Sequence, residues 1–276
     1  MNDPWTARDE YIDVVMDRAR ATRFLERNAS RELTQPERTR LWKLLEIQRH
    51  AMLMYTSCGW FFDELSGIET TQVIQYAGRA VELAEELFGG GIEQRFVARL
   101  EKVPSNVPEH GNGRRIYERS VLPARVDLAK VAAHYAVSSL FQTYADKAAV
   151  YCYPVESHDR RAGEAGRARL AVGHATVMST ITEESAHFAY GAIRLADHTV
   201  SGGVREFVRE ADYTQVADEL ASTFRNADFA TAMRLMDRYF HASIYSLRSL
   251  FHDQQQVILE KAMERSLAQA EASYRQ

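Results

Sequence analysis

The sequence predicts a mainly helical fold, a helical bundle with a small antiparallel β-sheet inserted in its second half. Only 14 glycines and 6 prolines occur among the 276 residues, and turn-rich sheet proteins use more of both. Apolar residues recur at helical spacing through the first half of the chain and again near its end. We therefore expect a single domain over residues 1–276, helical over 1–147, with the sheet over about 148–203 and helix again over 204–276.

The first helices are predicted from their start signals and apolar faces. One helix is expected over residues 6–27. A second starts at Thr34–Glu37, where a cap residue, a proline and a glutamate form the capping-box pattern. A third is expected over Glu69–Phe88 and ends at the glycines 89–91. The predicted core face of the second helix consists of Leu41, Leu44, Leu45, Met52 and Tyr55.

Two segments interrupt these helices. Residues 55–67 contain a glycine, three consecutive aromatic residues and two carboxylates. Residues 101–113 hold two prolines, two glycines and two asparagines, which predicts a long loop, and long loops are often functional. Helical spacing resumes over Asp127–Phe141.

Short runs rich in Val, Tyr, Thr and Ile predict the antiparallel sheet. The expected strands are Ala149–Val155, Ala168–Thr180 and Ser185–His198. Turns are expected at Arg161–Gly163, Gly166 and Ser201–Gly203. Helix returns over Asp212–Gln276, with a last helix over Gln254–Tyr274.

The composition argues against several partners. The formal net charge is −4 and the densest run of arginines is interrupted by glycine and glutamate, so we expect no nucleic-acid binding. No apolar run reaches the roughly 18 residues of a membrane span, so no membrane association is expected. Cys58 and Cys152 lie far apart without metal-ligand spacing, which fits a reducing, cytoplasmic location. The polar start has no leader, as expected for a domain excised from a longer protein.

The aromatic and acidic residues at 60–64 are the most distinctive candidate site. A sugar ring offers an apolar CH face for stacking and hydroxyl groups for hydrogen bonds, which suits a tryptophan beside carboxylates. Alternatively, Trp60, Phe61 and Phe62 anchor the hydrophobic core at a helix break. Asp63 and Glu64 are not expected to form a retaining glycosidase pair. Adjacent side chains diverge, whereas the two carboxyl groups of such a pair converge at about 5 Å.

No metal and no cofactor is expected. Glu184 and His187 have the Glu-x-x-His spacing of di-iron helix bundles, but such a site requires a second copy, and the sequence has none. Motifs for dinucleotides, nucleoside triphosphates, metalloproteases and α/β-hydrolases are also absent from the sequence. Core or surface hydrogen bonding is the expected role of His134, His174, His198 and His241.

Four parts of the sequence carry a resemblance to a known family. They are residues 3–9, Tyr55–Thr70, Ser105–Gly113 with Ile116–Glu118, and Tyr245–Phe251. Together they resemble a helical C-terminal domain of unknown function that follows the catalytic barrel in bacterial members of glycoside hydrolase family 57, the α-amylase- and α-mannosidase-like enzymes. The segment Tyr55–Thr70 is the most specific part of this resemblance.

The resemblance implies a division of labour within a longer polypeptide. In that family a (β/α)7 barrel carries a glutamate nucleophile and an aspartate acid/base for retaining cleavage or transfer of α-glucans. A helical region after the barrel closes one side of the cleft, and the segment around Trp60 is similar to an aromatic motif that reaches toward the substrate. The barrel is expected N-terminal to residue 1, so this chain lacks both catalytic carboxylates and is not expected to be an enzyme by itself.

We therefore expect a non-catalytic, cleft-closing and substrate-shaping domain of a family 57-like α-glucan-acting hydrolase or glucanotransferase. Its expected partners are an α-glucan or oligosaccharide and the N-terminal catalytic barrel of the same polypeptide. The expected substrate-binding residues are Trp60, Phe61, Asp63, Glu64, Asn106 and Glu109. The alternative is a helical interaction or assembly domain without a sugar site. A metal-dependent helical enzyme built on Glu184 and His187 is the third hypothesis.

Overall fold

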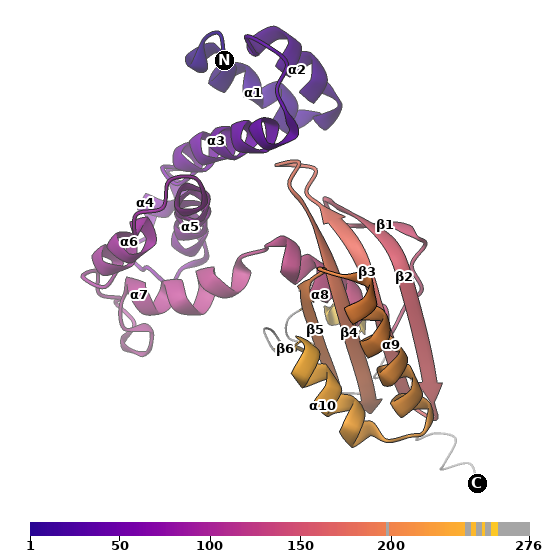
Figure 1. Ribbon diagram of the computed structural model, residues 1–276. Helices are drawn as coiled ribbons and strands as arrows, with labels where there is room; N and C mark the ends of the chain where they lie inside the picture. Colours follow the sequence, from indigo (N-terminus) through magenta and orange to yellow (C-terminus); the bar gives the residue numbers. More distant parts are fainter. Residues whose placement is uncertain (197–198, 241–243, 247–249, 252–254, 259–276) are drawn as a thin grey trace. The chain divides into compact units, whose positions relative to one another are not determined.

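The computed structural model describes all residues except 197–198, 241–243, 247–249, 252–254 and 259–276. Backbone contacts divide the chain into two compact units. Unit 1 comprises Met1–Arg125 with Ile181–Glu183, and unit 2 comprises Val126–Thr180 with Glu184–Gln276. Unit 1 is helical, whereas unit 2 combines a sheet with helices (Figure 1). The predicted combination of helices with an antiparallel sheet is confirmed, and the sheet is larger than expected.

Unit 1 is a succession of helices joined by short turns. Its α-helices are α1 (Pro4–Met16), α2 (Ala21–Asn28), α3 (Gln35–Leu53), α4 (Cys58–Phe61), α5 (Ile68–Phe88), α6 (Ile92–Leu100) and α7 (Gly113–Ile116). Its 3-10 turns are Arg18–Arg20, Pro108–His110 and Leu122–Ala124, and a π-helical turn covers Tyr117–Val121.

Aspartate and threonine caps set the starts of the first helices. Asp3 accepts hydrogen bonds from the backbone N–H groups of Trp5 and Thr6. The prediction of one helix over residues 6–27 is wrong, because Asp17 adopts an extended backbone and its side chain caps the following turn at Ala19. The capping box at Thr34 is confirmed, with the Thr34 N–H donating to the Glu37 carboxylate at 3.0 Å.

The apolar face of α3 is buried only along its first half. Leu41 and Leu45 are buried as predicted, together with the neighbouring Trp42. They pack against buried residues of α1 and α2 in one cluster. Met52 and Tyr55 were expected in the core but are 57% and 66% exposed. The helical spacing continues to the end of α3, whereas the cluster that α1 and α2 form on α3 includes only Leu41, Trp42 and Leu45 of this helix.

Unit 2 contains a sheet whose described strands lie side by side in chain order, β1-β2-β3-β4-β5-β6, with every pair antiparallel. The strands are β1 (Lys147–Val150), β2 (Tyr153–Ala165), β3 (Ala168–Met178), β4 (Ser185–Ala196), β5 (Thr199–Glu206) and β6 (Ile244–Tyr245). The α-helices are α8 (Leu128–Ser138), α9 (Glu210–Arg225) and α10 (Phe229–Phe240).

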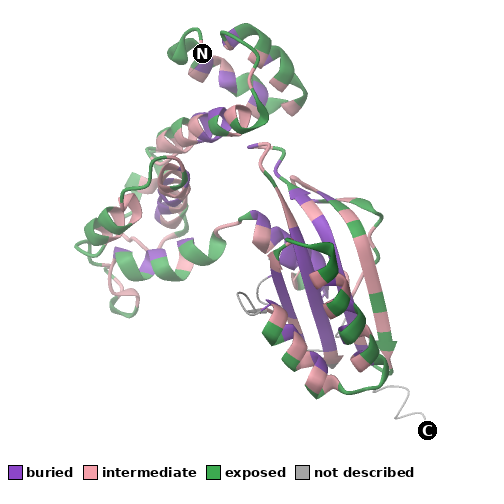
Figure 2. Ribbon diagram, in the orientation of Figure 1, coloured by how far each residue is buried: buried purple, intermediate pink, exposed green. Residues whose placement is uncertain are grey.

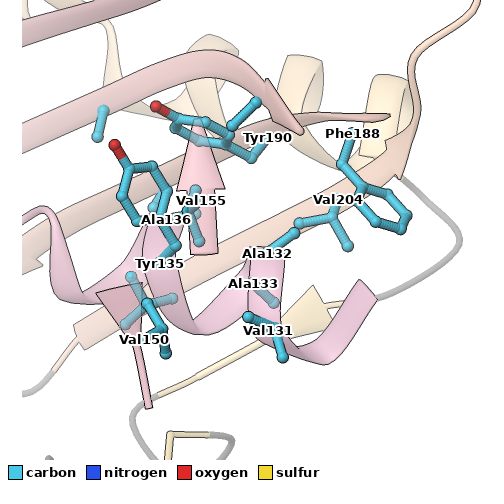
Figure 3. Packing of buried hydrophobic residues seen from close by; sticks show 14 of the residues in the cluster. Val131, Ala132, Ala133, Tyr135, Ala136, Val150, Val155, Phe188, Tyr190 and Val204 are labelled. Carbon is cyan, nitrogen blue, oxygen red and sulfur yellow. The ribbon is translucent and has the colours of Figure 1, made fainter. Parts of the chain in front are cut away.

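Helices cover both faces of this sheet (Figure 1). Buried side chains of α8 pack against Val155, Phe188, Tyr190 and Val204 on one face (Figure 3). Side chains of α9 and α10 pack on the other face in a second cluster. The middle strands are therefore buried on both sides (Figure 2), which explains the nearly continuous apolar sequence of β3.

Several predicted strand limits are wrong, and local backbone geometry explains why. The expected strand Ala149–Val155 is divided by a turn in which Tyr151 has a positive φ of 53°. Gly166 does form the predicted turn, with φ +60°. Gly163 and Gly202 instead lie inside strands. A Cβ atom at Gly163 would lie 3.1 Å from Phe224, and one at Gly202 would lie 2.8 Å from Val137. Glycine at these positions allows helices to approach the sheet closely and does not mark a turn.

The predicted helical return near the C-terminus is confirmed for α9 and α10, but helix at Ile244–Tyr245 is wrong, because these residues form strand β6 and pair with β5. These two helices are separated at Ala227, which has a positive φ of 57°. The predicted helix Gln254–Tyr274 lies outside the described residues except for 255–258, which are helical. His198 and His241 also lie outside the described residues.

Candidate functional site

The candidate site of unit 1 is the aromatic segment, defined as residues 55–62, between α3 and α5. Tyr55 is 66% exposed, Trp60 70%, Phe61 82% and Phe62 50%. The hypothesis that Trp60, Phe61 and Phe62 anchor the core is therefore wrong. Four large aromatic side chains instead lie at the surface within eight residues of sequence.

Gly59 explains how a short helix can present so many aromatic residues. A Cβ atom at Gly59 would lie 2.4 Å from the Val73 side chain of α5. The backbone of α4 therefore packs directly on α5 at this position, and its neighbours Cys58 and Trp60 are exposed. Any larger residue at 59 requires α4 or the Val73 side chain to shift.

The exposed rings form two pairs of different geometry. The rings of Tyr55 and Trp60 are nearly parallel, with 14° between their planes and 6.5 Å between their centroids. Phe61 and Phe62 meet edge to face, with centroids 5.0 Å apart. Because the Tyr55 and Trp60 rings stack on each other, an outer ring face remains for a flat apolar ligand, whereas the phenylalanine rings lie edge to face.

Glu64 connects the aromatic segment to the loop 101–113. Its carboxylate accepts hydrogen bonds from the Ser105 hydroxyl at 2.6 Å and from the Asn106 backbone N–H at 2.7 Å. It also accepts from the Ser66 backbone N–H at 2.8 Å. The bond from Ser105, followed by the one from Ser66, lowers the pKa of Glu64 to about 2. Glu64 is thus an ionised carboxylate with several donors already bound.

Asn106 and Asp63 complete this connection. The Asn106 side-chain amide donates to the backbone oxygen of Asp63, which leaves the exposed Asp63 carboxylate facing solvent. Of the six predicted substrate-binding residues, hydrogen bonds join three, Asp63, Glu64 and Asn106, whereas Trp60 and Phe61 precede them in the sequence with exposed rings. The sixth, Glu109, is exposed in the 3-10 turn Pro108–His110 of the same loop.

The loop 101–113 is more ordered than its composition predicts. Pro104 forms a β-bridge with Asn112, and the Gly113 N–H donates to the Val103 oxygen at 2.9 Å. The Ser105 N–H likewise donates to Gly111. The loop is closed on itself, so it holds Ser105 and Asn106 in place for Glu64.

Sequence reasoning missed two participants in this site. The helical spacing of α3 predicts Tyr55 in the core, and no pattern in the sequence distinguishes Ser105 as a site residue. Gly59 carries a usable signal for the exposed segment, because glycine allows a close backbone approach, here of α4 to α5, and its neighbours Cys58 and Trp60 are exposed. The Ser105 contact depends on how the loop returns, which local sequence does not encode.

A metal site at Glu184 and His187 is not supported. Glu184 lies in the turn before β4 and His187 lies in β4, so the pair is not on a helix. Within the described part of the chain, no three or more His, Cys, Asp or Glu side chains are arranged to hold a metal ion. Every helix in that part is too short or too polar to cross a membrane.

Comparison with known proteins identifies the family but not a relative of known structure. Residues 1–251 match the family described as Domain of unknown function (DUF3536). No curated protein and no solved structure matches the chain. The family match covers most of the 276 residues, including the aromatic segment and the sheet. The chain therefore belongs to the family Domain of unknown function (DUF3536).

Proposed function

We propose that this chain is a non-catalytic carbohydrate-binding domain that shapes the substrate cleft of a family 57-like α-glucan-acting glycoside hydrolase or glucanotransferase. The observation that carries the proposal is the exposed, nearly parallel pair Tyr55 and Trp60, with the exposed Asp63 three residues after Trp60 in the sequence. The resemblance of Tyr55–Thr70 to that enzyme family supports the choice of an α-glucan. The catalytic barrel then precedes this domain in the same polypeptide, and the isolated chain hydrolyses no glucan. Cys58 and Cys152 are not joined by a disulfide, which fits the reducing cytoplasm as its location.

We propose a role for each predicted residue and for Tyr55. Trp60 and Tyr55 supply ring faces for the CH groups of a sugar, and Phe61 extends the apolar surface. The Asp63 carboxylate accepts hydrogen bonds from sugar hydroxyl groups. Glu64 holds the loop through Ser105 and Asn106. Glu109 lies further along that loop and is available to a longer oligosaccharide.

Calorimetric titration of the full chain with maltoheptaose tests this proposal. Replacing Trp60 with alanine removes a stacking surface worth about 1 to 3 kcal/mol by analogy with other aromatic stacking, so affinity should fall roughly 5- to 150-fold. The matched control is Trp5→Ala, because Trp5 is 67% exposed on α1 of the same unit. The proposal would be overturned if Trp60→Ala, Trp5→Ala and the unaltered chain bound maltoheptaose with equal affinity, or if the unaltered chain did not bind it.

A second candidate function is an interaction or assembly domain. The observation that favours it is apolar exposure beyond what a sugar platform needs. Phe61 is 82% and Ile68 79% exposed, and Met52 is 57% exposed. Exposed apolar side chains gathered in one region are typical of protein contacts. Light scattering over a concentration series tests it, and Phe61→Ser should abolish any self-association that this surface causes.

A further inference from the structure

Three histidines from neighbouring strands of unit 2 lie together on the sheet face that α9 covers. His158 belongs to β2, His174 to β3 and His187 to β4. The centroids of their rings are 4.8 to 5.7 Å apart. The register of β2 shifts between Ser157 and Asp159, so His158 sits at a bulge beside the other two. We call these three residues the histidine cluster.

The cluster contains a direct bond between two imidazole rings. Nδ1 of His174 and Nε2 of His187 are 2.9 Å apart. Such a bond needs an N–H on one ring and a lone pair on the other, so at least one of the two rings must remain unprotonated on its bonding nitrogen. If both rings are protonated, two N–H groups face each other and two positive charges lie in adjacent rings. His158 is exposed, and its Nε2 lies 2.8 Å from the Thr176 hydroxyl.

Phe207 connects this bond to the start of α9. Its ring stacks on both His174 and His187, with centroids 4.4 and 4.2 Å away. Its backbone N–H donates to the His187 oxygen at 2.9 Å. Tyr213 in α9 meets His174 edge to face at 4.7 Å. Phe207 lies only three residues before the first residue of α9, Glu210, so a change in either imidazole acts directly on the start of this helix.

The charged groups around the cluster do not cancel two added protons. The Glu210 carboxylate lies 3.7 Å from Nε2 of His174, but its side chain is 66% exposed, so solvent weakens this attraction. Asp159 faces the cluster from β2, but it already accepts a hydrogen bond from Tyr213 at 2.6 Å and pairs with Arg161 at 3.1 Å.

These surroundings leave both imidazoles harder to protonate than usual. Burial is the main cause of the lowered pKa of His174, and the positive charges of His158 and Arg161 add to it against Glu210 and Asp159. Burial also lowers the pKa of His187, and His174 and His158 lower it further against Glu210.

We propose that the histidine cluster is an acid-sensitive switch. Protonation of both His174 and His187 breaks their mutual bond and releases Phe207 and the first turn of α9 from the sheet. Protonation of the imidazoles is thermodynamically linked to opening, which sets the direction of the pH dependence. The closed form favours neutral imidazoles, so it is fully stable above the ordinary histidine pKa of about 6.5 and loses stability as the pH falls below that value. The switch belongs to unit 2 and does not depend on the proposed carbohydrate site.

Hydrogen exchange of the full chain tests the switch, with residues 207–213 followed from pH 7.5 to 5.5 in the presence of EDTA. The variant is His187→Gln, whose amide keeps hydrogen-bonding groups but does not titrate. The variant and the unaltered chain are compared at the same pH, so the intrinsic pH dependence of amide exchange is the same for both. At pH 5.5, opening of the unaltered chain should increase by up to about tenfold for each imidazole that gains a proton on opening. The variant should lack the contribution of residue 187.

Three results would overturn the proposal. They are no increase at 207–213, an equal increase in the variant, and an equal increase throughout α10 and the strands, which indicates global unfolding of unit 2. If His187→Gln does not fold at pH 7.5, His158→Gln replaces it, since residue 158 is exposed. That variant removes one neighbouring charge, so its opening should occur at lower pH than in the unaltered chain, and an unchanged midpoint also overturns the proposal.

Discussion

Two tryptophans of unit 1 have opposite environments. Trp42 is 1% exposed, whereas Trp60, only 18 positions later in the sequence, is 70% exposed. Each of the two rings contacts other aromatic rings. The Trp42 ring packs 6.0 Å from the Tyr11 ring and 5.6 Å from the Phe24 ring, so α1 and α2 return over α3 and cover it. Trp60 follows the end of α3, beyond this cover. Residue type alone therefore does not determine burial; the return of earlier helices does.

The same contrast holds for two glutamates. Glu46 is 3% exposed beside the Trp42 cluster. Burial acts to raise its pKa, but hydrogen bonds from His50, Tyr11 and Arg49 outweigh burial and lower it to about 2. Glu64 reaches a similar pKa at the surface through Ser105 and Ser66. Equal pKa values thus arise from a buried ion network in one region and from a loop connection in the other.

The largest expected effect is at Trp42. Trp42→Ala should destabilise the protein by about 3 to 5 kcal/mol, because it leaves a large cavity between three helices. Thermal unfolding measures this loss. Trp42→Phe is the matched control, since it keeps most of the ring and removes an indole N–H that is buried without a hydrogen-bond partner among the described residues. If Trp42→Ala lowers the Tm no more than Trp60→Ala does, the contrast between the two regions is wrong.

The second effect is acid sensitivity through Glu46. The folded pKa is about 2, below the ordinary value of 4.5, so the unfolded chain binds the extra proton. Stability is therefore present above pH 4.5 and is lost as the pH falls toward 2, by up to about 3 kcal/mol. Urea unfolding at several pH values gives the slope. Glu46→Gln should remove this part of the slope, and an unchanged slope would contradict the assignment.

A smaller, local effect is expected at Glu64. Glu64→Gln replaces one acceptor oxygen with an N–H₂ group that faces hydrogen-bond donors, so the loop 101–113 should open more often. Amide exchange at Asn106 should become faster while exchange in α5 stays the same. Glu109→Gln is the matched control, because Glu109 is an exposed carboxylate in the same loop. Equal exchange in both variants would show that Glu64 does not hold the loop.

The smallest expected effect is on stability at the exposed rings. Trp60→Ala and Phe61→Ala should each change the free energy of unfolding by about 0.5 kcal/mol or less, a Tm change of roughly 1 to 2 °C. Differential scanning calorimetry is sufficient to measure it. A decrease of more than about 5 °C would show that these rings cover a core, and it would remove the distinction from Trp42.

Local signals in the sequence predicted the helix limits well where a cap or a glycine fixes them. The Thr34 capping box and the helix ending before Gly89 need only neighbouring residues, and both are observed. Helical spacing alone does not predict which positions of α3 are buried, because Leu41 and Met52 belong to the same apolar pattern. Leu41 is buried by α1 and α2, and the path of these helices is not encoded in the sequence of α3.

In the sheet, too, local sequence does not reveal which distant elements come into contact. Gly163 and Gly202 were interpreted as turn residues, but each allows a helix from another part of unit 2 to approach its strand. The contacts of the candidate site also depend on the fold. Trp60, Asp63 and Glu64 were identified from composition, whereas the bond from Ser105 to Glu64 joins residues 41 positions apart. Contacts over such separations require the fold itself.

The strand order of unit 2 also affects how the protein is made. β1 to β5 each pair with the strand that directly precedes or follows them in the chain. As a ribosome releases the polypeptide from its N-terminal end, each new strand finds its neighbour already present, and the contacts that form are local in sequence. Among the described strands, only β6, which pairs with β5 at Gly202 and Gly203, must wait until α9 and α10 have also been synthesised. The sheet can therefore be assembled strand by strand during translation, with the edge beside β5 closed last.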